Sequence, residues 1–362
     1  MFLCAGIVAG WLGGKSEVDG VDDYTRDLIT ESIRLYEAAG RSNKVAEAQS
    51  ELAQCYWRAG DNETARILLT TALEKLTTGS PARANALLIL SSVEWAEARY
   101  NEVLKILTLN ATLFERSTNH TIRGAYHNQL GITLRAIGAK KTRTNYFQRA
   151  KEQYHAADEE LRLAKHLAFR AMVKNNLAFV LRELGQLDEA YQCLEQARRL
   201  LMRVGDRVKV ANVDDSRAQV LIAQKKYSLA EPIARSAART FKRAGRQCFL
   251  AEALINQGIA LARLQQPVRA QFIFQEAIEI AHQQRKKARR PQKWRNLHLR
   301  SSRENTHLYG TLNGLLVPSR GQGRRYRIPT VAPLISCVVL SRREVVEFMD
   351  SAKRPLSNRL RS

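Results

Sequence analysis

The 362-residue sequence is poor in the residue patterns that build cross-linked or metal-bound folds. It has five cysteines, and no two of them form a Cys-x-x-Cys pair. Its seven histidines show no metal-ligand spacing along a helix. An odd number of scattered cysteines is typical of reduced thiols in a cytoplasmic protein. We therefore predict no disulfide framework and no metal site.

Catalytic and membrane signatures are also missing. The sequence shows no nucleophile beside a base and no paired carboxylates, and segment 321–325 lacks the flanking elements and Lys-Ser/Thr of a phosphate-binding loop. The apolar N-terminus has no basic segment before it, and Lys15 interrupts it before a membrane-spanning length is reached. The sequence predicts a cytoplasmic protein without enzymatic activity, cofactor or membrane segment.

Signals for β-strands are sparse before about residue 310, whereas helix-forming residues dominate. The most regular stretch is 175–200, which is typical of two helices joined by a tight turn at Gly185. In the first helix, Ala178 is the small residue that permits a close crossing. One face of the second helix carries Ala190, Leu194 and Ala197.

The same order of small and bulky apolar residues recurs on both sides of this stretch. The phase is given by the small residue of each first helix, at steps of 38, 40, 47, 40 and 40 residues: Ala53, Ser91, Gly131, Ala178, Ala218 and Gly258. A single helix hairpin cannot bury its apolar face alone, so the units should stack on one another. The sequence therefore predicts an all-α fold.

Turns are expected at the glycines that separate the helical stretches, among them Gly60, Gly138, Gly185, Gly205 and Gly245. No glycine or proline occurs from Ala139 to Leu184. Together with the step of 47, this predicts an overlong second helix in the third unit, with a break near Asp158 or Ala164.

Over residues 40–282 the pattern resembles the tetratricopeptide repeat, in a longer variety similar to the sensor region of the bacterial maltose-regulon activator. Two units depart from it, with Asn110 and Arg143 where small residues are expected. The resemblance implies an α-solenoid of stacked antiparallel helix hairpins, a superhelix of the tetratricopeptide type. Residues 1–39 are interpreted as a partial N-terminal repeat in which Leu28, Ile29, Ile33 and Tyr36 face inward.

Residues 283–362 differ in character and hold 19 basic and 4 acidic residues, a net charge of +15 out of +23 for the chain. Segment 285–300 has no apolar periodicity, and we expect a basic, disordered tail. Its origin has two interpretations, a shifted reading frame or the remnant of a truncated domain. Nucleic-acid binding through this tail is the less favoured alternative for its role.

The first helices of stacked hairpins line the concave side, so residues flanking each small crossing residue should point into a groove. Amide and guanidinium groups recur there, and they can bond a peptide backbone or a carboxylate. The alternative is that they solvate the inner face or cap contacts between repeats. The candidate partner-binding residues are Asn128, Arg135, Asn175, Asn176, Arg182, Asp215, Gln219 and Asn256.

We therefore expect a non-catalytic scaffold or sensor that binds a protein or peptide partner in its concave groove. Bacterial cytoplasmic signalling is implied by the resemblance alone. The alternative function is the effector-sensing part of a transcription regulator whose DNA-binding domain is truncated or separate.

Overall fold

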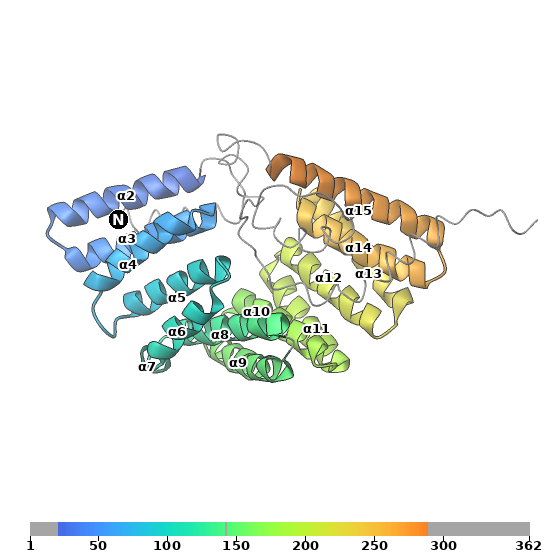
Figure 1. Cartoon of the computed structure of the whole chain (residues 1–362), viewed down its shortest axis with the longest axis horizontal. Helices are drawn as coiled ribbons and strands as arrows, with labels where there is room; N and C mark the ends of the chain where they lie inside the picture. Colours follow the sequence, from blue (N-terminus) through green and yellow to red (C-terminus); the bar gives the residue numbers. More distant parts are fainter. Residues whose placement is uncertain (1–20, 142, 289–362) are drawn as a thin grey trace, which may run out of the picture. The chain divides into compact units, whose positions relative to one another are not determined.

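The computed structural model describes residues 21–141 and 143–288, and these ranges form helices without a β-strand (Figure 1). The prediction of an all-α solenoid of antiparallel helix hairpins is confirmed. The chain divides into two compact units, Met1–Thr133 and Leu134–Ser362, and the boundary falls inside helix α8 (His120–Lys141). The first half of the expected partial repeat lies outside the described residues, as does the expected basic tail from residue 289 onward. Residues 283–288, which the sequence predicts as part of this tail, belong to the last helix, α15 (Pro267–Ala288).

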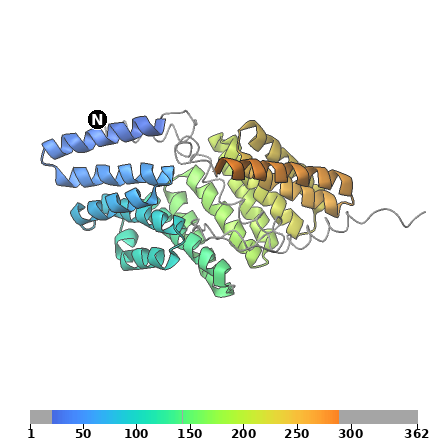
Figure 2. The same ribbon diagram turned by 45° about the horizontal axis from the view of Figure 1, so that its top comes forward.

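The first unit begins with two helices that lie side by side (Figure 2). Ile29 on the first of them is 1% exposed and packs with Ala48 and Leu52, so it faces inward as predicted. Asn110, one of the two departures from the repeat, separates the last two helices of the unit. The helices before α8 are α2 (Val21–Ala38), α3 (Ser42–Ala59), α4 (Asn62–Lys75), α5 (Pro81–Ala96), α6 (Tyr100–Leu109) and α7 (Ala111–Glu115).

The second unit contains three successive hairpins, coloured from green to orange in Figure 1. Their first helices begin at residues 167, 207 and 247 and their second helices at 187, 227 and 267, which confirms the predicted step of 40. Each first helix also contacts the next first helix. The helices are α9 (Thr144–Leu163), α10 (Leu167–Glu183), α11 (Leu187–Val204), α12 (Arg207–Ala223), α13 (Tyr227–Arg243), α14 (Gln247–Arg263) and α15 (Pro267–Ala288).

Small residues lie at the crossings of the paired helices, as the sequence predicts. Ala178 and Ala218 are at most 1% exposed. At Gly258 on α14, a Cβ atom would stand 2.5 Å from Cε1 of Phe274 on α15, closer than van der Waals contact allows. Any larger residue at Gly258 would push the two helices apart or displace the ring.

One predicted turn is wrong. Gly138 lies within α8 and does not end it. A Cβ atom there would stand 3.0 Å from Cβ of Tyr146 and 3.3 Å from Cε1 of Phe147 on α9. Gly138 therefore allows α8 to pack closely against α9, because glycine has no Cβ atom.

The turns of the second unit follow a 20-residue period in backbone conformation. One residue in the turn after each helix from α9 to α14 has a positive φ, in order Lys165, Gly185, Gly205, Lys225, Gly245 and Gln265. Lys165, with φ of 54°, ends the third unit beside Ala164, which confirms one of the two predicted break positions. Three of the six positions hold a side chain in the left-handed region, which costs about 1–2 kcal/mol relative to glycine's freedom there.

We predict that Lys225→Gly raises the free energy of unfolding by about 0.5–1 kcal/mol, because relief of the left-handed strain exceeds the added entropy of the unfolded chain. The turn's backbone bonds, from Lys225 N to Ile222 O at 2.9 Å and from Lys226 N to Leu221 O at 2.8 Å, should persist. Midpoints of urea unfolding measure the effect. The converse variant, Gly245→Lys, should lose a similar amount, and a lower midpoint for Lys225→Gly would contradict this account.

Candidate functional site

A chain of hydrogen bonds joins the first helices of the second unit. Arg182 Nη1 on α10 donates to Gln219 Oε1 on α12 at 2.6 Å. Gln219 Nε2 donates to Asp215 Oδ2 at 3.1 Å, and Asn256 Nδ2 on α14 donates to Asp215 Oδ1 at 2.8 Å. Four of the candidate residues thus form one connected network across three consecutive first helices.

The hydrogen bonds of this network lead to Asp215, directly from Gln219 and Asn256 and through Gln219 from Arg182. A guanidinium group can only donate, so Arg182 requires the carbonyl oxygen of Gln219 to face it. The amide nitrogen of Gln219 is then directed at the carboxylate of Asp215. The arrangement is therefore complementary to an ionised Asp215.

Burial opposes that ionisation. Asp215 is 6% exposed, and loss of solvent raises the pKa of its carboxyl group to about 7. The bonds from Asn256 and Gln219 and the charge of Arg182 lower this pKa, whereas the nearby Glu252 raises it. Asp215 consequently changes charge close to neutral pH, at the junction of three repeats.

Two arginines of the predicted groove meet at one aromatic ring. The guanidinium carbons of Arg135 on α8 and Arg182 on α10 lie 5.7 and 5.3 Å from the ring centroid of Phe179. Both distances are within the range of a cation–π contact. Arg135 also interacts with Tyr154, whose pKa is raised to about 12 by its complete burial. Phe179 therefore holds two cationic side chains from successive first helices.

The remaining candidates differ in exposure. Asn175 is 8% exposed, and its Oδ1 accepts no hydrogen bond within the described part of the chain. Asn176, its neighbour, is half-buried. Asn128 lies in the first unit and is 5% exposed. Partner binding by the candidate residues stays a prediction, and within the second unit two of them, Arg135 and Arg182, meet at Phe179.

The sequence did not single out the apolar side chains on the face of α10 that its neighbouring helices leave uncovered. Met172 is 46% exposed, and Phe169 and Phe179 are half-buried. With Asn176 they follow steps of three and four residues, which place them along one stripe. That spacing is a usable signal, but by itself it does not distinguish an exposed stripe from a buried one.

Other polar groups on these helices hold the hairpins together. Asp158 on α9 accepts from Arg170 Nε at 2.7 Å and pairs with Lys174 Nζ at 2.9 Å, both on α10. Despite partial burial, these two cations lower the pKa of the Asp158 carboxyl group. Burial raises the pKa of the Cys193 thiol on α11. Asp158 thus fixes α9 against α10, and Cys193 packs as an uncharged thiol.

Two properties of the described ranges bear on function. Within residues 21–141 and 143–288, His, Cys, Asp and Glu side chains form no group of three or more that could hold a metal ion. In the same ranges, no helix combines the length and apolar character needed to cross a membrane.

We predict that Asp215 makes stability fall as pH rises. Its folded-state pKa of about 7 exceeds the unfolded value of 3.8, so the unfolded chain releases this proton first. The contribution is complete below pH 4 and is lost as pH rises to 7, with an upper bound on the order of 4 kcal/mol. Asp215→Asn should remove this part of the pH dependence in urea unfolding.

A matched control is Glu152→Gln, which neutralises an exposed carboxylate on α9 of the same unit. This variant should keep the wild-type slope between pH 4 and pH 7. Equal slopes for Asp215→Asn and the wild type would show that the Asp215 carboxylate is solvated.

Part of the chain matches a known protein family. The family model described as Tetratricopeptide repeat matches residues 169–243, which span α10 to α13. No curated protein sequence matches the chain.

Solved structures share the fold at low sequence identity. The apo form of RapI has a TM-score of 0.56 at 11% identity, covering 86% of this chain and 81% of its own. A Rap protein in complex with Competence and Sporulation Factor has a TM-score of 0.51 at 11% identity, with 77% and 75% covered.

A signal transduction ATPase from Pyrococcus horikoshii with a tetratricopeptide repeat sensor has a TM-score of 0.56 at 14% identity, and the match covers 80% of this chain. The chain spans 46% of that protein's length. At these identities the likeness concerns the fold alone. Residues 169–243 thus match the tetratricopeptide repeat, and the described part of the chain has the fold of a tetratricopeptide-type helical solenoid.

Proposed function

We propose that the chain is a non-catalytic scaffold or sensor that binds a partner polypeptide along the uncovered face of its first helices. The supporting observation is the stripe of Phe169, Met172 and Phe179 on α10, beside which the polar network joins α10, α12 and α14. Exposed apolar side chains that lie together on one face are typical of interaction surfaces. Solenoids offer such extended faces because each repeat adds one helix to them.

In this proposal the apolar stripe supplies the anchoring contacts and the polar groups set the register. Asn176 and Gln219 bond the partner's backbone, since an amide both donates and accepts. Arg135 and Arg182, on either side of Phe179 in sequence, select an acidic side chain or a terminal carboxylate. A suitable partner would therefore present apolar residues followed by negative charge.

The buried candidates have a different role in the same proposal. Asn128, Asn175, Asp215 and Asn256 are each less than a tenth exposed. They hold the first helices at the spacing on which the partner lies, so that their effect on binding is indirect. This agrees with the network through which Asp215 and Asn256 link α12 to α14.

The comparisons support partner binding at the level of the fold. The Rap structure with its bound factor is a solenoid of similar fold that holds a second molecule. The scattered cysteines support a cytoplasmic location, and the likeness to the sensor of a signal transduction ATPase supports a signalling role. We propose that this signalling is of the bacterial type.

The second candidate is the effector-sensing part of a transcription regulator whose DNA-binding domain is separate or truncated. It is supported by the likeness to the tetratricopeptide repeat sensor of the Pyrococcus horikoshii ATPase. Resemblance to the maltose-regulon activator belongs to this candidate.

We predict that Met172→Glu weakens partner binding at least tenfold without unfolding the array. The new carboxylate would lie in the apolar contact that the partner makes with the side chain at this position. Partners are first captured from lysate of the source cell with the wild-type chain. Their binding to purified variants is then measured by titration. The matched control is Leu229→Glu, which alters an apolar residue of similar exposure, 55% against 46% for Met172, on the second helix α13.

Loss of binding in Leu229→Glu with retention in Met172→Glu would move the site away from the first helices. A chain shortened after Ala288, where α15 ends, tests the basic tail separately. If only this shortened chain loses the partner, or if the captured partner is DNA released by salt, the proposed scaffold function is wrong.

A further inference from the structure

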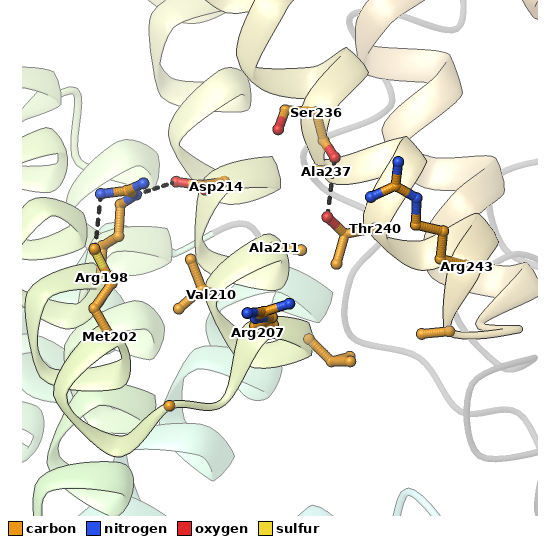
Figure 3. A pocket seen from close by; sticks show the side chains of 13 residues that line it. Arg198, Met202, Arg207, Val210, Ala211, Asp214, Ser236, Ala237, Thr240 and Arg243 are labelled. Atoms are coloured by element: carbon orange, nitrogen blue, oxygen red, sulfur yellow. Dashed lines mark hydrogen bonds and ion pairs between the residues drawn. The ribbon is translucent and has the colours of Figure 1, made fainter.

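A pocket of about 730 Å³ lies on the second-helix side of the array, within the second unit. It is bounded by the C-terminal halves of α11 and α13 and by the N-terminal half of α12 between them (Figure 3). Its lining includes none of the candidate groove residues and none of the apolar stripe on α10. It is therefore a separate feature from the proposed partner surface.

Three arginines from three different helices stand around this pocket. Arg198 comes from α11, Arg207 from the first turn of α12 and Arg243 from the last turn of α13 (Figure 3). The acidic residue in the lining is Asp214. The lining thus carries three positive charges and one negative charge.

The single carboxylate is already shared. Asp214 Oδ1 lies 2.9 Å from Arg198 Nε and also accepts from Arg217 Nη1, outside the pocket lining, at 2.7 Å. The side chains of Arg207 and Arg243 form no hydrogen bond or ion pair with any residue that the structure describes, and both residues are exposed. Their positive charge is consequently available to a ligand.

The nearest other acid does not change this balance. Asp206, the N-cap of α12, accepts from the backbone N–H of Lys209 at 3.0 Å and pairs with Lys209 Nζ at 2.6 Å. It is occupied by its own helix and its own counter-ion. The N-terminal end of α12 also carries a partial positive charge, which adds to that of Arg207.

The floor and walls between the arginines are largely apolar. They are formed by Met202, Val208, Val210, Ala211 and Ala237. Pockets of roughly 300–1,000 Å³ with apolar walls and a few polar groups are typical of small-molecule sites. The combination fits a ligand with an apolar or planar body and more than one anionic oxygen.

We propose that this pocket binds a small organic phosphate of about the size of a mononucleotide. Its phosphate oxygens contact Arg207 and Arg243, and its organic body lies on Met202 and Val208. A phosphate suits this place better than a single carboxylate, because its oxygens point in several directions and can accept from guanidinium groups on different helices.

The test is a titration of the full chain with a fluorescent N-methylanthraniloyl derivative of ADP, followed by competition. The Arg207→Ala/Arg243→Ala double variant should bind the probe at least tenfold more weakly than the wild type. Arg207→Lys/Arg243→Lys should retain part of the affinity, because it keeps the charge while removing the planar donor fork. Arg239→Ala, which alters an exposed arginine of α13 outside the pocket lining, should bind as the wild type does.

The comparison among variants is required because residues 283–362 carry a net charge of +15 and attract any anion. Unlabelled ADP should displace the probe, while adenosine at the same concentration should not. Inorganic phosphate should compete only at a concentration at least tenfold higher. Unchanged affinity in the double alanine variant would overturn the proposal, as would displacement by adenosine or equal potency of inorganic phosphate. Equal unfolding midpoints for all variants confirm that the array is intact.

Discussion

The paired helices of this chain approach each other closely only because one residue at each crossing has little or no side chain. Gly258 makes the constraint visible, since a single added carbon atom would lie 2.5 Å from the ring of Phe274. Ala178 and Ala218 occupy the same phase in the preceding hairpins and are almost completely buried. Close packing at these points fixes how each first helix is rotated. It thereby decides which of its side chains meet the next repeat and which remain exposed.

This rotation explains why charged and amide groups connect the repeats. Once the crossing residue faces the partner helix, Arg182, Asp215 and Asn256 lie toward the adjacent first helices, where their polar atoms need partners. The resulting network is satisfied, but it contains a carboxylate whose pKa is raised to about 7. Inter-repeat contact and protonation are therefore linked in the same group of atoms.

The sequence was sufficient for the fold because the packing signal is periodic and local. Small residues at regular steps predicted the hairpins and their phase, and the helix starts at 167, 207 and 247 confirm it. The sequence was less informative where one residue type can either form a turn or allow a close helix contact. Gly138 had the composition of a turn, yet it serves close contact inside α8. Lys225 and Gln265 occupy left-handed turns that no glycine marks, because a cost of about 1–2 kcal/mol is small beside the burial gained by stacking.

The candidate site was predicted in part for a similar reason. Polar residues close to the crossing residue of each first helix included the members of the hydrogen-bonded network, because neighbouring repeats are related by a constant step. The exposed stripe around Met172 was missed, since an apolar residue at helical spacing is normally buried. The pocket arginines Arg198 and Arg243 are brought together only by the stacking of α11 against α12 and α13. No short motif records such a juxtaposition.

The 20-residue spacing of the left-handed turn residues limits how such an array can change in length. An extra residue inside a helix rotates everything after it by about 100°, which would carry a crossing residue away from its partner. Seven extra residues amount to about two full turns and nearly restore the original direction. The step of 47 between Gly131 and Ala178 has this total, and the extra residues are divided between α8, which has 22 residues, and α9, which has 20, against 17 or 18 in α10 to α14. Viable insertions and deletions in this chain should therefore come as whole helical turns.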